Sequence, residues 1–240
     1  MMTDANDHSR QLWARWAGLL LVATNLTAMF AIWTRGTFLA SRDAAQTAAN
    51  IAGGETWFRL GLAFELITIA GVIPLVAGLY VVLKPVAPNL ALLATLWRLV
   101  ENCILAMLTF ASFTALALLG GSDFMRVLDP GAAGELVYAL QRVHSWGFQV
   151  GFLFLGLGQL LFSLLWWRSR YIPRWLAGLG VLASAIMVAM ALGIIVWPPL
   201  YGIVTMAYMA PMGLYEIGLG LLLAIRGIRI PAAGGEDQRR

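Results

Sequence analysis

The sequence predicts an all-α membrane protein, a bundle of six transmembrane helices with both termini in the cytoplasm. The 240 residues are 60% hydrophobic and only 12% charged, whereas a soluble domain has about 25% charged residues. Their mean hydropathy is +0.80. Six apolar runs reach the roughly 20 residues that a helix needs to cross the hydrocarbon core. Basic residues concentrate at alternate ends of these runs, as in multi-pass proteins.

The first two spans are separated by a polar segment. Residues 13–34 form an apolar run with no small-residue cleavage site after it, which favours a retained helix over a signal peptide. Residues 57–83 form the second span, which Lys84 and Pro85 end because proline cannot continue a helix. The polar residues 35–56 between them are predicted to form a loop.

The third and fourth spans are less regular in length. Residues 90–120 form a helix about 46 Å long, which must tilt or extend beyond the hydrocarbon core. Residues 143–167 form the fourth span, and its helix can begin as early as Glu135. Residues 122–134, with their proline, glycine and acidic residues, are predicted to form a loop.

The last two spans complete one transmembrane domain over residues 1–230. Residues 175–196 end at a pair of prolines, and residues 205–226 form the sixth span. Residues 231–240 are polar and glycine-containing and are predicted to be a disordered cytoplasmic tail. No remaining segment is long enough for a second domain.

The orientation follows from the distribution of basic residues. One set of helix ends carries Arg10, Arg15, Lys84, Arg168, Arg170, Arg174, Arg226, Arg229, Arg239 and Arg240. The opposite set carries Arg35, Arg42 and Arg126. The richer side is expected to be cytoplasmic, which places the protein in a bacterial inner membrane with both termini inside. Tryptophans near most helix ends agree with this arrangement.

The ionisable residues within the spans are the candidates for function, because each costs about 2.5–3.5 kcal/mol at a helix centre. They are Arg59, Glu65, Arg98, Glu101 and Glu216. Two arginines therefore face three glutamates. At least one carboxylate lacks a cationic partner unless Arg142 or His144 reaches it.

Depths calculated from the helix rise separate these residues into two polar layers. The inner layer, about 12–16 Å from the cytoplasmic helix ends, contains Asn25, Arg98, Glu101, Gln159 and Glu216. The outer layer, about 27–36 Å from those ends, contains Arg59, Glu65, His144 and Gln149.

Helical spacing supports an inward face for the inner layer. Arg98, Glu101 and Asn102 share one side of their helix at spacings of three and four. Glu216 aligns with Gly220 and Ala224, a stripe of small residues that allows a neighbouring backbone to approach closely.

A short loop carries a family resemblance that covers nearly the whole chain. The loop motif consists of Ser169, Tyr171, Ile172, Pro173, Arg174, Trp175 and Leu176. Together with WFRLG at 57–61, LWRLVE at 96–101 and PMGLYEIGLGL at 211–221, it resembles the bacterial membrane family called domain of unknown function 4386. The glycine that usually ends the motif is replaced by Ala177. The resemblance implies this membrane fold and no particular reaction.

Composition and motifs argue against several functional classes. A lone cysteine, Cys103, excludes an intramolecular disulfide and a cysteine-based metal site. With His8 and His144 as the only histidines, a haem held by two intramembrane histidines is excluded. There is no basic groove for nucleic acid and no hydrolase or nucleotide-binding motif. No catalytic residue, metal or cofactor is predicted, and the balance leans against an enzyme.

Two main hypotheses remain. In the first, the protein binds or passes a small solute or proton at a buried centre formed by Arg98, Glu101 and Glu216, with Asn25 and Gln159 nearby. In the second, it is a non-transporting interaction or regulatory subunit whose buried charges are structural, with a membrane protein or a second copy as partner. A lipid-modifying enzyme ranks third. The first predicts an internal cavity, and the second predicts a tightly packed interior.

Overall fold

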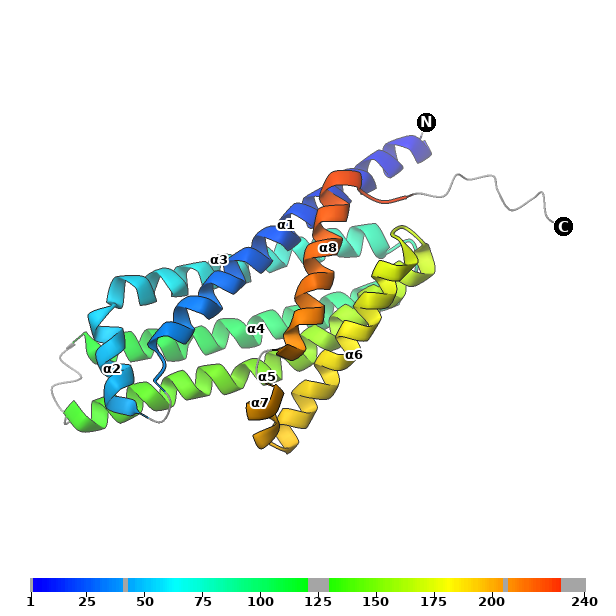
Figure 1. Ribbon diagram of the computed structural model, residues 1–240. Helices are drawn as coiled ribbons and strands as arrows, with labels where there is room; N and C mark the ends of the chain where they lie inside the picture. The colour runs from blue at the N-terminus through cyan, green and yellow to red at the C-terminus, as the bar shows by residue number, and fades with distance from the viewer. Residues whose placement is uncertain (1, 41–42, 121–129, 205–206, 230–240) are drawn as a thin grey trace.

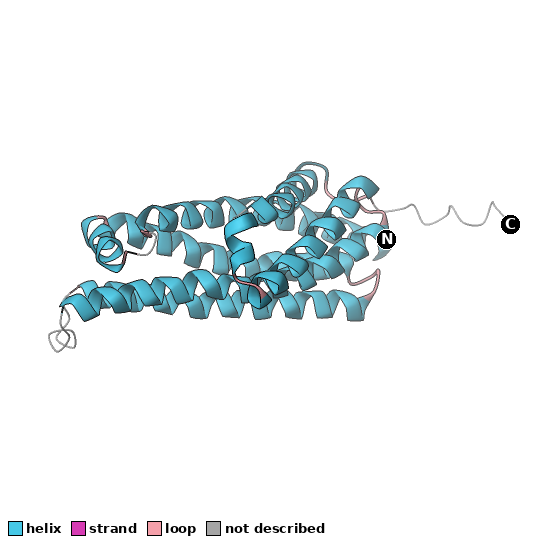
Figure 2. Ribbon diagram, turned by 60° about the horizontal axis from the view of Figure 1, so that its bottom comes forward, coloured by secondary structure: helices cyan, strands magenta, loops and turns pink. Residues whose placement is uncertain are grey.

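The computed structural model describes residues 2–40, 43–120, 130–204 and 207–229, and every regular element in these ranges is a helix (Figure 2). Six helical segments are long and apolar enough to cross a membrane, which confirms the predicted all-α bundle of six membrane helices. The elements are α1 (Met2–Phe38), α2 (Ala44–Gly53), α3 (Glu55–Leu83), α4 (Pro88–Leu119), α5 (Pro130–Ser169), α6 (Arg174–Val196), α7 (Pro199–Val204), the 3-10 turn η2 (Ala207–Met209) and α8 (Ala210–Arg226).

The segment predicted as a loop over residues 35–56 is mostly helical, so that prediction is wrong. α1 continues to Phe38 and α2 follows directly after Asp43, whose side chain accepts a hydrogen bond from the backbone N–H of Gln46 at 2.8 Å. Such a cap satisfies a helix N–H group that has no partner within the helix. Thr47 and Ile51 are buried, so tertiary packing adds to the cap in stabilising α2.

α5 also differs from its predicted extent. Its 40 residues begin at Pro130, a favoured residue for the first helical position, rather than at residue 143. The predicted loop over residues 122–134 is therefore helical from Pro130 onward, and its earlier part lies outside the described residues. The predicted tail, residues 231–240, also lies outside them.

The long helices α1, α3, α4 and α5 run along the length of the molecule, whereas α6 and α8 cover only the end near the chain termini (Figure 1). α2 covers the other end (Figure 1). The main contacts of α8 are with α1 and α6, and α6 in turn packs on α5. α8 also contacts α5 through a buried hydrogen bond from Oγ of Ser163 to the hydroxyl of Tyr215 at 3.1 Å.

The contact between α1 and α8 depends on small residues. A Cβ atom added to Gly18 would lie 2.4 Å from the backbone nitrogen of Ala224 and 2.6 Å from the carbonyl oxygen of Gly220. The predicted stripe on α8 thus receives the backbone of α1, as small residues do in membrane helix pairs. Asn25 lies two turns from Gly18, and Glu216 lies one turn from Gly220, so this contact brings the two polar side chains together.

The loop that carries the family motif joins three segments of the chain. Tyr171 is buried, and its hydroxyl accepts a hydrogen bond from Nη2 of Arg10 at 2.5 Å. Its carbonyl oxygen accepts a hydrogen bond from the backbone N–H of Arg229 at 3.0 Å. Because Arg10 belongs to α1 and Arg229 follows α8, the motif fixes these two helices to the α5–α6 loop.

Candidate functional site

A cavity of about 460 Å³, called the main cavity below, lies within the end of the bundle that α6 and α8 cover. Residues of α1, α3, α4, α5, α6 and α8 line it. Most of its wall is apolar, including the rings of Phe148 and Phe152. The polar and charged lining residues are Thr24, Asn25, Thr68, Arg98, Glu101, Asn102 and Glu216. Four of the five residues predicted for the inner layer therefore share one cavity.

Arg98 and Glu101 form a buried ion pair on one face of α4. Nη1 of Arg98 lies 2.8 Å from Oε2 of Glu101, but neither atom has a hydrogen bond because the angles are unfavourable. The backbone of α5 lies close to Arg98 at Gly158. A Cβ atom on Gly158 would lie 2.8 Å from Cγ of Arg98 and 3.0 Å from the carbonyl oxygen of Ala94. Gly158 is thus the residue that makes room for Arg98.

Glu216 is the carboxylate that this arrangement leaves without a cation. Its Oε2 accepts a hydrogen bond from Nδ2 of Asn25 at 3.1 Å. Its Oε1 is buried and has no hydrogen-bond partner. In the described part of the chain Glu216 takes part in no ion pair. The excess carboxylate indicated by the residue counts is therefore Glu216.

Gln159 differs from the other residues of the predicted inner layer. It is buried, but it does not line the main cavity, and its Nε2 has no hydrogen-bond partner. Asn102 lines the cavity instead. Its Nδ2 donates to the carbonyl oxygen of Ile69 at 2.9 Å, which joins α4 to α3.

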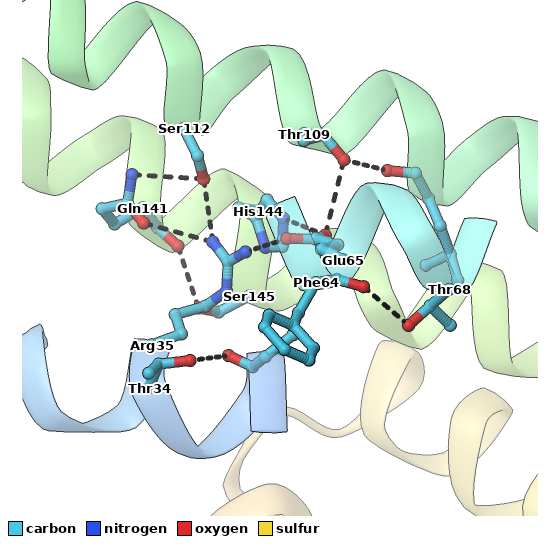
Figure 3. A network of polar contacts seen from close by, with 12 residues as sticks. Thr34, Arg35, Phe64, Glu65, Thr68, Thr109, Ser112, Gln141, His144 and Ser145 are labelled. Atoms are coloured by element: carbon cyan, nitrogen blue, oxygen red, sulfur yellow. Dashed lines mark hydrogen bonds and ion pairs between the residues drawn. The ribbon is translucent and has the colours of Figure 1, made fainter. Parts of the chain in front are cut away.

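A second polar group, called the Arg35 network below, is shown in Figure 3. It lies toward the α2 end of the bundle, because Arg35 is in the last turn of α1. Arg35 forms an ion pair and a hydrogen bond with Oε2 of Glu65, and Nε2 of His144 lies 2.9 Å from Oε1 of the same carboxylate. Arg35 also donates to Oγ of Ser112 at 2.8 Å and to Oε1 of Gln141 at 3.4 Å. Three helices besides α1 therefore contribute to one charge-compensated group.

The Arg35 network corrects the predicted outer layer in three ways. The side chain of Arg59 is 56% exposed and pairs with Glu55 at 2.7 Å on its own helix, so it does not belong to a buried layer. Gln149 accepts a hydrogen bond from the hydroxyl of Tyr208 at 2.9 Å, apart from the network. Arg35, interpreted from the sequence as a flanking residue, supplies the buried cation, because α1 extends beyond the predicted end of its span.

A smaller cavity of about 50 Å³ lies between the main cavity and the Arg35 network. Arg35 and Glu65 line it. The residues that line both cavities are Ala28, Ile32, Thr68, Leu105 and Phe148. The hydroxyl of Thr109 on α4 donates to Oε1 of Glu65 at 3.5 Å and so belongs to the Arg35 network. The two polar groups are separated only by a short section of the bundle, since Thr109 lies about 12 Å beyond Glu101 along α4.

Six spanning helices around an internal cavity with buried charges define a polytopic helical membrane protein. The chain belongs to the family described as Domain of unknown function (DUF4386), whose model matches residues 16–227. This match confirms the resemblance carried by the loop motif. No curated protein and no solved structure matches the chain.

Proposed function

We propose that the protein binds a small solute in the main cavity, with Glu216, Asn25 and the Arg98–Glu101 pair at the polar end of the site. The observation that carries this proposal is the cavity of about 460 Å³ at the predicted buried charges. Small-molecule sites are typically about 300–1,000 Å³, mainly apolar, with a few polar groups that orient the ligand. The main cavity has each of these properties.

The cavity favours this proposal over a purely structural role for the buried charges. An interaction subunit without a ligand predicts a tightly packed interior, because protein interiors are normally close-packed. The main cavity departs from that expectation, and a bound solute would supply the missing contacts. We propose further that the solute or a proton passes through this site across the membrane. The small cavity that extends toward the Arg35 network supports this proposal.

We expect Gly213→Leu to weaken binding of the neutral probe 1-naphthylmethanol at least about tenfold, or about 1.4 kcal/mol. Gly213 lines the main cavity, and a Cβ atom there would meet nothing within 4 Å. The larger side chain therefore occupies ligand space without disturbing the fold. Titration calorimetry of the purified protein in nonionic micelles measures the affinity.

The matched control is Gly36→Leu. A Cβ atom on Gly36 would also meet nothing within 4 Å, and this residue lies outside the lining of the main cavity. The control has the same micelle background as the test variant and should bind as the natural protein does. Equal heats from all three proteins would mean that the probe only enters the micelle, and the proposed binding site would be rejected.

We propose further that the protein resides in a bacterial inner membrane with both termini in the cytoplasm, as the basic flanks indicate. Green fluorescent protein fused after the last residue is then expected to fluoresce, because it folds in the cytoplasm. Alkaline phosphatase fused at the same point should be inactive. The opposite pair of results would reverse the orientation.

A further inference from the structure

We infer that the solute of the main cavity is a lipophilic cation, an apolar body with one protonated amine or quaternary ammonium group that lies against Glu216. This inference rests on the proposed function and adds the chemical class of the ligand. It follows from the charge of the lining, from the geometry of the carboxylate and from the nature of the walls.

The charge of the lining favours a positive ligand. Among the described residues, three ionisable side chains line the main cavity: Arg98, Glu101 and Glu216. The first two compensate each other, with Nη1 and Oε2 at 2.8 Å. Glu216 remains, and a buried charge is stable only when it is paired or fully hydrogen-bonded. A cationic ligand supplies the missing partner, whereas an anionic ligand adds repulsion.

The geometry of Glu216 leaves one buried oxygen without a hydrogen-bond donor. Nδ2 of Asn25 donates to Oε2 at 3.1 Å and to the carbonyl oxygen of Leu21 at 2.9 Å. These two hydrogen bonds fix the position of the amide group. Oε1 has no hydrogen-bond partner, although the residue is only 7% exposed. The carboxylate is thus held by one oxygen, while the other is buried and lacks the donor that a cationic ligand would supply.

The walls fit the apolar part of such a ligand. Phe148, Phe152 and Trp33 line the main cavity together with aliphatic and methionine side chains. Aromatic rings attract cations through their negative faces, and methionine adapts to ligands of irregular shape. A strongly hydrated inorganic cation would gain nothing from the apolar surface that makes up most of these walls.

The rim of the cavity indicates that such a ligand arrives through the membrane. Met29 and Trp33 on α1 are 59% and 62% exposed, and Ala210 at the start of α8 is exposed. All three also line the main cavity. The cavity therefore reaches the surface between α1 and the first turn of α8, within segments that are apolar enough to span the membrane.

The test compares three probes with one apolar body and different charge: 1-naphthylmethylamine, 1-naphthylmethanol and 1-naphthoate, each titrated at pH 7 into the protein in nonionic micelles. Gly213→Leu gives the micelle background for each probe. We expect the protonated amine to bind at least about tenfold more tightly than the alcohol, since a charge-assisted hydrogen bond is worth about that factor. The carboxylate should bind most weakly.

Glu216→Gln keeps the size and the hydrogen bond to Asn25 while removing the charge. In this variant the amine and the alcohol are expected to bind with equal affinity. If the natural protein binds the alcohol as tightly as the amine, or if Glu216→Gln keeps the preference, the cationic class is wrong and the cavity still binds solutes. If no probe gives heat above the Gly213→Leu background, the proposed function fails as well.

Discussion

Replacing Glu65 with methionine is expected to lower the free energy of unfolding by about 3–5 kcal/mol, the cost of leaving a buried charge without its partner. The Arg35 side chain is only 10% exposed and pairs with Glu65. Its remaining contacts, with Ser112 and Gln141, are to neutral oxygens. Equilibrium unfolding in mixed micelles, followed by far-UV circular dichroism, measures the loss.

A double variant separates the charge effect from the loss of packing. Arg35→Met combined with Glu65→Met removes both charges, so it should recover much of the stability that Glu65→Met loses. The control pair is Arg59 with Glu55, whose side chains are 56% and 48% exposed. Arg59→Met should change stability by at most about 1 kcal/mol. A double variant less stable than Glu65→Met alone would contradict this account of the network.

Gly18→Leu is the second change with a large expected effect, a loss of at least about 3 kcal/mol, the upper end of the usual cost of overpacking. The new Cβ would meet backbone atoms of α8 at 2.4 and 2.6 Å, and backbone cannot move aside as a side chain can. α1 and α8 would separate, and Asn25 would lose its contact with Glu216. The same unfolding experiment measures the effect.

Gly218→Ala is the matched control on α8. Its Cβ would meet only Cδ1 of Leu176 at 3.6 Å, an ordinary contact. Alanine in a helix interior is favoured over glycine by about 0.5–1 kcal/mol, so this variant should be as stable as the natural protein or slightly more stable. If Gly18→Leu behaved like Gly218→Ala, the close α1–α8 contact would be refuted.

The fold class could be predicted from the sequence because hydropathy and length decide whether a helix spans a membrane. The lengths of α1 and α5 could not, because a helix that continues beyond the hydrocarbon core no longer needs apolar residues. For the same reason Arg35 was placed at a helix flank. The excess of carboxylates within the predicted spans was the one signal that a buried cation had not been identified. Arg35 supplies this cation, and it lies one residue after the predicted end of its span.

The site was predicted best where spacing within one helix was informative. Arg98 and Glu101 share a face of α4, and both line the main cavity. For Glu216 the small-residue stripe indicated which side of α8 meets another helix. Gln159 and Arg59 show the limit, because the helix rise gives the depth of a side chain but not the direction in which it points around the helix axis.

The exposed rim formed by Met29, Trp33 and Ala210 has a consequence for any measurement of affinity. A ligand that enters from among acyl chains is at equilibrium with both the aqueous and the lipid-dissolved ligand, and a lipophilic ligand has most of its free pool in the lipid. Occupancy then depends on the molar ratio of ligand to lipid. Adding empty vesicles at a fixed total amount of ligand would lower occupancy, so dissociation constants for this protein should be expressed as mole fractions in the bilayer.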